Sequence, residues 1–139
     1  MELPLFASLA SHEEAAGSDV QIVTSLAAFD AAMATARAAG RPVLLDFSAD
    51  WCIECKTIDR NVFSNKTVQQ HMRDVVLIRA DMTNYNDASR ALMQRFDVFG
   101  PPTMIFFDAE AGKEIPQART VGPIDADTFI RRLAGARRS

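Results

Sequence analysis

The chain has 139 residues, enough for one domain with a hydrophobic core but not for two. Fifteen basic and 18 acidic residues give a net charge of −3, which argues against general nucleic-acid binding, because that requires a basic face. No apolar stretch reaches the roughly 18 residues of a membrane helix. The 2 cysteines are too few for a disulfide scaffold.

The first 19 residues differ in composition from the rest of the chain. The apolar start, Met1 to Ala10, has no basic residue before it, and a polar tract of small residues follows from Ser11 to Asp19. This is a poor match to a signal peptide. We therefore expect residues 1–19 to be a tail or linker and residues 20–139 to form the domain. The chain is then either cytosolic or cut from a larger protein.

Strands and helices are expected to alternate along the domain. Short β-branched or continuous apolar runs predict strands, and apolar residues at three- and four-residue steps predict helices. The expected strands are 20–23, 43–47, 75–78, 103–107 and 118–121. One helix is expected at 25–39, and a second begins near Cys52, is interrupted at Ser64-Asn65 and resumes its apolar face with Val68 and Met72. A third is capped by Asn86, with Ala88, Leu92 and Phe96 inward, and a last one is capped by Asp125. This order predicts an α/β sheet covered on both faces, with its first three strands parallel and its last two in an antiparallel hairpin.

Two cysteines lie where a buried strand gives way to a helix, in the segment WCIECK at 51–56. The helix N-terminus stabilises a thiolate at Cys52, and Cys55, one turn later, can attack a mixed disulfide that Cys52 has formed. Within a βαβ pattern this spacing predicts a redox pair. The alternatives are two inert buried thiols or half of a zinc site, although zinc usually takes four ligands and only His12 and His71 remain.

The chain resembles the thioredoxin family. The segment DFSADWCIECK at 46–56 is similar to the thioredoxin active-site segment, and GPPT at 100–103 is similar to the cis-proline loop of that fold. ADWC-X-X-CK at 49–56, VFS at 62–64, ADMT at 80–83 and PQAR at 116–119 resemble the C-terminal periplasmic domain of the bacterial membrane thiol:disulfide interchange protein DsbD. The resemblance implies a thioredoxin fold, with a central mixed β-sheet flanked by helices on both faces.

The same resemblance implies a function and a compartment. The chain would be a thiol:disulfide reductase domain on the periplasmic side of the bacterial inner membrane, part of a larger membrane protein in electron transport and cytochrome c biogenesis. A membrane-embedded cysteine pair of that protein would donate electrons, and its N-terminal periplasmic domain would accept them. The Cys52–Cys55 disulfide would be the redox centre, without a metal or organic cofactor, and the isolated domain would be a monomer. Two alternatives stay open: a cytosolic thioredoxin reduced by a flavoenzyme, and a redox-inert binding module.

The resemblance makes Asp46 the buried carboxylate beneath the thiols. Without a partner, its pKa would be raised, and Asp46 can then exchange a proton with Cys55. The alternative is an aspartate that is solvated or caps the strand end. Arg79 on the third strand is placed either to pair with Asp46 or to lie in solvent.

Acidic side chains surround the predicted redox pair in the sequence. They are Asp46, Asp50, Glu54 and Asp59. Asp59 follows Cys55 by four residues and hence shares its helix face. These carboxylates disfavour a Cys52 thiolate, and Lys56 is the only nearby cation, so the charge pattern predicts a reductant rather than an oxidant. Glu54 and Asp59 can each equally be solvated surface charges.

The expected docking residues for a partner lie at the cysteines and in the proline loop. They are Trp51, Ile53, Glu54, Pro101 and Pro102. The resemblance makes Pro102 a cis-proline beside the cysteines, where a partner strand can pair with the backbone. Pro101 offers no amide hydrogen, and Ser48 stands where many thioredoxins carry a tryptophan, which together indicate a restricted list of partners. For Trp51 the alternative is a purely packing role.

Overall fold

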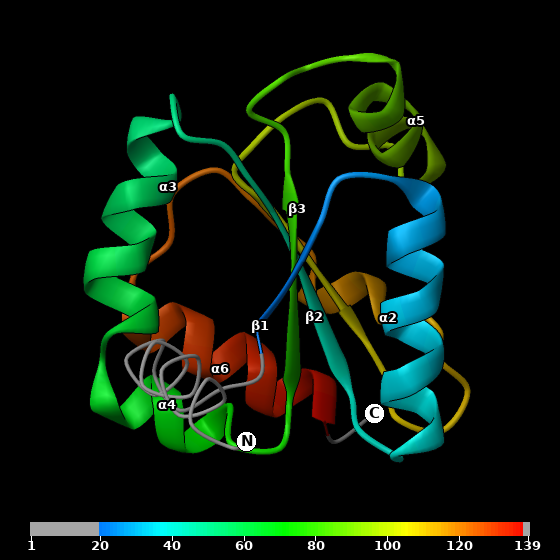
Figure 1. The fold of residues 1–139 in the computed structure, drawn as a ribbon. Coiled ribbons are helices and arrows are strands. Elements are labelled where there is room, and N and C mark those ends of the chain that lie inside the picture. Colours follow the sequence, from blue (N-terminus) through cyan, green and yellow to red (C-terminus); the bar gives the residue numbers. More distant parts are fainter. Residues whose placement is uncertain (1–19, 138–139) are drawn as a thin grey trace, which may run out of the picture.

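A five-stranded mixed sheet forms the centre of the computed structural model, which describes residues 20–137 (Figure 1). Its strands are β1 (Val20–Val23), β2 (Val43–Ser48), β3 (Val76–Asp81), β4 (Thr103–Phe107) and β5 (Thr120–Val121), in the order β1-β3-β2-β4-β5. β1 and β2 run parallel to β3, whereas β4 is antiparallel to β2 and β5. The predicted mixed sheet, its parallel first strands and its antiparallel last pair are confirmed. The predicted tail at 1–19 lies outside the described residues.

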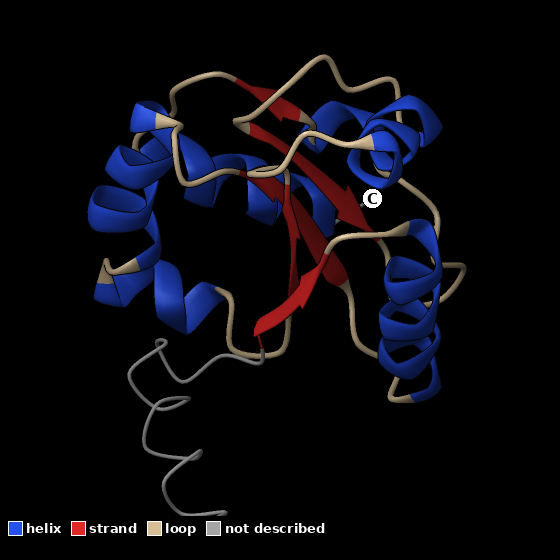
Figure 2. Cartoon of the chain, turned by 45° about the horizontal axis from the view of Figure 1, so that its top comes forward, coloured by secondary structure: helices blue, strands red, loops and turns tan. Residues whose placement is uncertain are grey.

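Helices cover both faces of this sheet (Figures 1 and 2). They are α2 (Leu26–Ala38), α3 (Ile53–Ile58), α4 (Lys66–His71), α5 (Asp87–Arg95) and α6 (Ala126–Arg137), with a π-helical segment η1 (Asp59–Phe63) between α3 and α4 and a 3₁₀ turn η2 (Pro116–Ala118) before β5. α2 and α5 lie on one face, and α3, α4 and α6 lie on the other. The helix expected from Cys52 is therefore present as three consecutive pieces.

The central strand β2 is buried on both faces, as its continuous apolar run predicts. Successive side chains of a strand point to opposite faces. Leu45 and Phe47 pack in the core beneath α2 and α5, and Leu44 packs in the core beneath α4 and α6. Asp46 alternates with Leu45 and Phe47, so its carboxylate points to the face that α3 and η1 cover.

The predicted inward position of Ala88 is wrong. Ala88 is exposed, and Ser89 is buried instead. The Asn86 side chain accepts a hydrogen bond from the Ser89 N–H at 3.0 Å, and the Ser89 hydroxyl oxygen accepts one from the Asn86 N–H at 2.8 Å. This capping box fixes where the first turn of α5 begins, and the turn brings Ser89 rather than Ala88 against the sheet.

The predicted fifth strand at 118–121 is shorter than expected. Residues 116–118 form the 3₁₀ turn η2, and only Thr120 and Val121 pair with β4. Pro116 lacks an amide hydrogen and favours a turn over a strand at this point.

One end of the sheet gathers four loops. Ser48 pairs with Asp81 where β2 and β3 end, and Phe47 pairs with Thr103 where β4 begins. Val121, at the end of β5, also pairs with Thr103. The segments 49–52, 82–86, 98–102 and 121–123 therefore leave the sheet at the same end. This register brings the cysteine segment and the proline loop together.

Candidate active site

Cys52 and Cys55 form a disulfide at the start of α3, with their Cα atoms 5.3 Å apart. Cys52 is the N-cap residue of α3, and its Sγ accepts a hydrogen bond from the Cys55 N–H at 3.1 Å. Cys52 is 7% exposed and Cys55 is 4% exposed. The predicted pair is thus joined, and the sulfur at the helix N-terminus has an amide donor that would also stabilise a thiolate.

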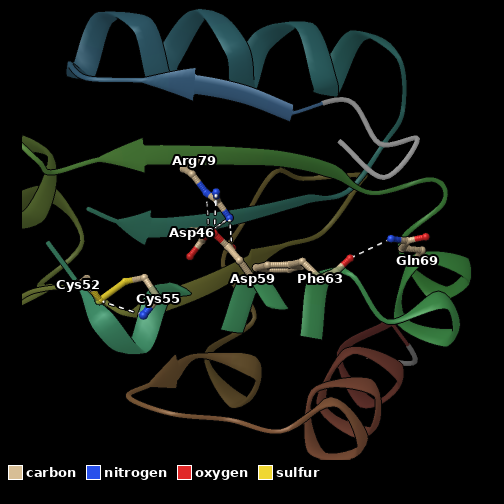
Figure 3. Close-up of polar contacts among 7 residues, drawn as sticks. All are labelled: Asp46, Cys52, Cys55, Asp59, Phe63, Gln69 and Arg79. Carbon is tan, nitrogen blue, oxygen red and sulfur yellow. Dashed lines mark hydrogen bonds and ion pairs between the residues drawn. A yellow bond between two sulfur atoms is a disulfide. The ribbon is translucent and has the colours of Figure 1, made fainter. Parts of the chain in front are cut away.

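Asp46 is buried, as expected, but it has a partner. The carboxylate is 4% exposed and accepts a hydrogen bond from Arg79 Nε at 3.0 Å, and a second guanidinium nitrogen lies 2.9 Å away (Figure 3). Burial raises the pKa of Asp46 to about 6, because desolvation of the carboxylate outweighs the opposing effect of the Arg79 charge. The pairing of Asp46 with Arg79, which the sequence left open, is therefore present, and the pKa of Asp46 is raised as expected.

The Arg79 guanidinium also forms an ion pair with Asp59. The Asp59 carboxylate accepts hydrogen bonds from two Arg79 nitrogens, at 2.7 and 3.4 Å. The Phe63 ring lies 5.9 Å from the centre of that guanidinium. Asp59 and Phe63 are the first and last residues of η1, whose wider turn is visible in the Ser64 N–H donating to the Asp59 carbonyl at 3.1 Å. Gln69 donates to the Phe63 carbonyl at 3.1 Å and so holds the end of the segment (Figure 3).

A cavity of about 170 Å³ opens beside this group of charges. Arg79 and Asp59 line it together with Ile22, Ser48, Ala49, Asp50, Lys56 and Asp81. Arg79 and Asp59 line the cavity, whereas Asp46 does not and is buried behind them. The Asp59 side chain is 42% exposed. Asp59 is therefore paired with Arg79 and at the same time partly open to solvent.

Trp51 is held by the loop that follows β3. Its indole Nε1–H donates to the Thr83 carbonyl at 3.2 Å, and the Asp50 N–H donates to the Thr83 hydroxyl oxygen at 2.9 Å. The Trp51 ring is exposed. The alternative of a packing tryptophan is therefore wrong. Thr83 thus holds Trp51 at the surface of the domain.

The peptide bond between Pro101 and Pro102 is cis, as the resemblance implies. The Pro102 carbonyl accepts a hydrogen bond from the Gly122 N–H at 3.0 Å, and the Thr103 hydroxyl donates to the Gly100 carbonyl at 2.7 Å. These bonds tie the proline loop to β4 and to the end of β5. Pro102 is buried, and Pro101 is partly exposed.

Exposed large apolar side chains lie on the chain segments at this loop end of the sheet. We call this group the apolar rim, and its members are Trp51, Ile53, Tyr85, Phe99 and Val121. Phe99 is 99% exposed. Of these residues, Trp51 and Ile53 were predicted from the sequence, whereas Tyr85, Phe99 and Val121 were not. Phe99 had a signal, because it is an aromatic residue in a loop between the end of a helix and Gly100.

Within residues 20–137, no group of three or more His, Cys, Asp and Glu side chains is placed to hold a metal ion. None of the helices in this part of the chain is both long enough and apolar enough to span a membrane. Glu54 is exposed beside the disulfide, and His71 ends α4 with no role that the site requires.

Comparison with protein families gives a thioredoxin-like match over residues 24–109. The thiol:disulfide interchange protein DsbD 1 of Pseudomonas aeruginosa is 47% identical over 116 residues, which are 84% of this chain and 20% of that protein. DsbD of Ralstonia nicotianae is 45% identical over 130 residues, which are 94% of this chain and 21% of that protein. The chain thus spans about a fifth of the length of these curated relatives.

Solved structures agree with the sequence matches. The oxidised C-terminal domain of Neisseria meningitidis DsbD superposes with a TM-score of 0.73 and 31% identity, over 84% of this chain and 99% of that one. A thioredoxin from Thermus thermophilus superposes with a TM-score of 0.70 at 23% identity, over 86% of each chain, which supports the fold alone. The predicted thioredoxin fold is therefore confirmed.

The raised pKa of Asp46 makes the stability of the domain depend on pH. The folded state keeps a proton on Asp46 up to about pH 6, whereas an unfolded aspartate loses it near 3.8. Stability from this group is therefore lost as pH rises from about 4 to 6, by roughly 3 kcal/mol in total. We expect Asp46→Asn to remove this loss, so that the free energy of unfolding of the variant rises relative to that of the wild type between about pH 4 and 6. Urea unfolding of both proteins at pH 4, 5, 6 and 7 measures the difference, and a pH-independent difference would contradict the assignment.

Proposed function

We propose that this chain, which belongs to the thioredoxin-like family and within it to the DsbD C-terminal domains, is a thiol:disulfide reductase domain. The observation that carries the proposal is the disulfide between Cys52 and Cys55 at the N-terminus of α3, on the loop end of the sheet that also holds the cis-proline and the apolar rim. The relatives' printed name, thiol:disulfide interchange protein, agrees with this reaction class.

The reaction begins with the reduced dithiol. The Cys52 thiolate attacks one sulfur of the partner's disulfide, so that a mixed disulfide forms and the other partner sulfur leaves as a thiolate. Cys55 then gives its proton to the Asp46 carboxylate and attacks the Cys52 sulfur. The Cys52–Cys55 disulfide forms, and the second partner sulfur leaves and takes up a proton. Two electrons pass to the partner, whose disulfide is reduced while the domain's dithiol is oxidised.

We further propose that the donor and the acceptor are parts of a larger membrane protein. A membrane-embedded cysteine pair would return the Cys52–Cys55 disulfide to the dithiol, and an N-terminal periplasmic domain would receive the electrons. The DsbD relatives, which are about five times as long as the matched segment, support this arrangement. The domain would then work on the periplasmic side of the inner membrane. The disulfide itself is the redox centre, so the exchange needs no metal or organic cofactor.

The apolar rim is the docking surface in this proposal. Cys52 is nearly buried, so a partner has to approach closely before its disulfide reaches the sulfur. Exposed aromatic side chains supply area that becomes buried on docking, and Trp51 is already held in place by Thr83. Pro101 lacks an amide hydrogen and therefore offers a partner strand only its carbonyl, which supports a restricted choice of partners.

The two cysteines should not be equivalent in trapping partners. Cys55→Ser leaves the attacking Cys52 but removes the resolving thiol, so we expect stable mixed disulfides with partner proteins. Cys52→Ser should trap few, because Cys55 lies within α3 rather than at its N-terminus and is 4% exposed. Non-reducing gels of both variants, expressed with the parent membrane protein's other domains, measure the difference. Equal trapping by the two variants would contradict the assigned roles, and rapid reduction by NADPH and a thioredoxin reductase would favour the cytosolic thioredoxin alternative.

The domain should be a reductant. Among the acidic neighbours of Cys52, Asp46 and Asp59 share the Arg79 cation, a cation that the sequence count of charges near the pair had left out. The two carboxylates of Asp50 and Glu54 are then opposed by the single positive charge of Lys56, so the surroundings of the cysteine pair are still net acidic. We expect a reduction potential nearer thioredoxin's, at about −270 mV, than that of a strong oxidant at about −120 mV. Equilibration with glutathione measures it, and a value above about −180 mV would contradict the charge argument.

Phe99 should be important for partner docking but not for stability or for the chemistry. Its side chain is 99% exposed, so Phe99→Ala removes no packing from the free domain. Loss of a buried anchor from an interface costs about 1–2 kcal/mol, or roughly 5- to 30-fold in kcat/KM toward a protein disulfide. As the control, the rate at which a small disulfide oxidises the reduced domain should be the same for Phe99→Ala and the wild type. Phe99→Leu should restore most of the loss, and equal rates for Phe99→Ala and wild type with the protein disulfide would exclude Phe99 from docking.

A further inference from the structure

Arg79 binds two carboxylates from different elements at once. Asp46 comes from β2, buried in the sheet, and Asp59 comes from η1, at the cavity. We infer that Arg79 is a positioning residue that joins Asp46 and Asp59 into one ionic cluster and thereby sets the pH range in which disulfide exchange is fast. The inference rests on the proposed function, in which Asp46 takes the proton of Cys55.

The backbone fixes the first half of the cluster. Asp46 and Arg79 are register partners on the adjacent parallel strands β2 and β3. Their side chains leave the sheet on the same face, and Nε together with a second guanidinium nitrogen reaches the Asp46 carboxylate at 3.0 and 2.9 Å. The Arg79 side chain is 24% exposed, so the pair is only partly screened by solvent.

The π-helical segment fixes the second half. η1 presents Asp59 and Phe63 to the same guanidinium, with Asp59 at 2.7 Å and the Phe63 ring 5.9 Å from its centre. A planar guanidinium can bind carboxylates along two of its edges and stack on an aromatic ring at the same time, whereas a lysine ammonium is a point charge without these directions. The contacts of Arg79 use all of these features.

Other charges face the cluster from the neighbouring elements. They are Lys56 from α3, Asp50 from the loop after β2, and Asp81 from the end of β3, all at the cavity wall. Burial disfavours the charge of Arg79, but Asp46 and Asp59 more than offset this and raise the pKa of Arg79 above its usual value. Arg79 therefore stays a cation throughout the working range, and Asp46 is the member of the cluster that gains or loses a proton near pH 6.

The chemical consequence concerns the proton acceptor. Asp46 can accept the Cys55 proton only while it is ionised, and the adjacent cation favours the ionised form. Without Arg79 the buried carboxyl would hold its proton to higher pH. Exchange would then slow in mildly acidic solution and stay unchanged in alkaline solution.

The experiment measures two properties of the full chain in four variants. The first is the titration of Asp46 in the oxidised form, and the second is the rate of disulfide exchange. Arg79→Met removes the cation, Arg79→Lys keeps the charge but not the two-sided geometry, and Asp59→Asn removes the second carboxylate. Arg95→Met is the matched control, because Arg95 also has an aspartate partner, Asp30, and an aromatic ring contact but lies on the opposite face. Carbon-13 NMR follows the titration of the Asp46 carboxyl, and exchange with a protein disulfide is measured from pH 5 to 9.

We expect the Asp46 midpoint to rise by roughly 1 pH unit or more in Arg79→Met. A one-unit rise makes exchange about fivefold slower at pH 6 and leaves it nearly unchanged at pH 8. Arg79→Lys should give a smaller rise, Asp59→Asn should lower the midpoint, since the Asp59 charge repels that of Asp46, and Arg95→Met should match the wild type.

Three results would overturn the inference. The first is an unchanged Asp46 midpoint in folded Arg79→Met, and the second is an equal rise of the midpoint in Arg95→Met. The third is a shifted midpoint without a shift in the pH at which the exchange rate falls in acid. If Arg79→Met does not fold, the opposite shifts of Arg79→Lys and Asp59→Asn decide the question. Failure of the proposed function is distinguishable, because a domain that reduces no disulfide at any pH still reports the Asp46 titration.

Discussion

A carboxylate in the middle of a buried strand is the constraint on which this structure depends. Desolvation of the Asp46 carboxylate is unfavourable at neutral pH, and a cation on the neighbouring strand, Arg79, offsets part of this cost. The segment η1 adds a second carboxylate, Asp59, which also stabilises the charge of Arg79. The strand register, the π-helical segment and the polar cavity are thus parts of one electrostatic arrangement.

The charged groups and the exposed apolar groups concentrate at neighbouring places on the domain. The Arg79 cluster lies beneath α3 and η1, and the cavity beside it extends to Ile22 and to Ala49 and Asp50 of the loop before Trp51. The cavity therefore reaches the loop that carries Trp51, and a partner docked on the rim would lie close to it.

The sequence predicts most of the fold because local patterns and topology agree. Continuous apolar runs identify β2 and β4 to within a residue, and the cysteine spacing identifies the redox pair. The failures have local physical causes: the Asn86 capping box turned Ser89 inward in place of Ala88, and Pro116 shortened the last strand. The partnership of Arg79 with Asp46 was left open, because it depends on the register between two strands 33 residues apart. The rim residues Tyr85, in the loop after β3, and Val121, at the end of β5, are brought to the same end of the domain only by the assembled sheet.

The π-helical segment also makes the length of the chain part of the site. Each residue of a regular helix advances the side-chain direction by about 100°, and a π turn closes over one residue more than an α turn. Deletion of one residue between Asp59 and Phe63 would let α3 continue as an ordinary helix and would leave all five strands intact. One of those two side chains would then turn away from Arg79. Evolution can therefore gain or lose the cluster by a single-codon insertion or deletion, so related domains that differ in length at this point should differ in the acidity of their buried aspartate.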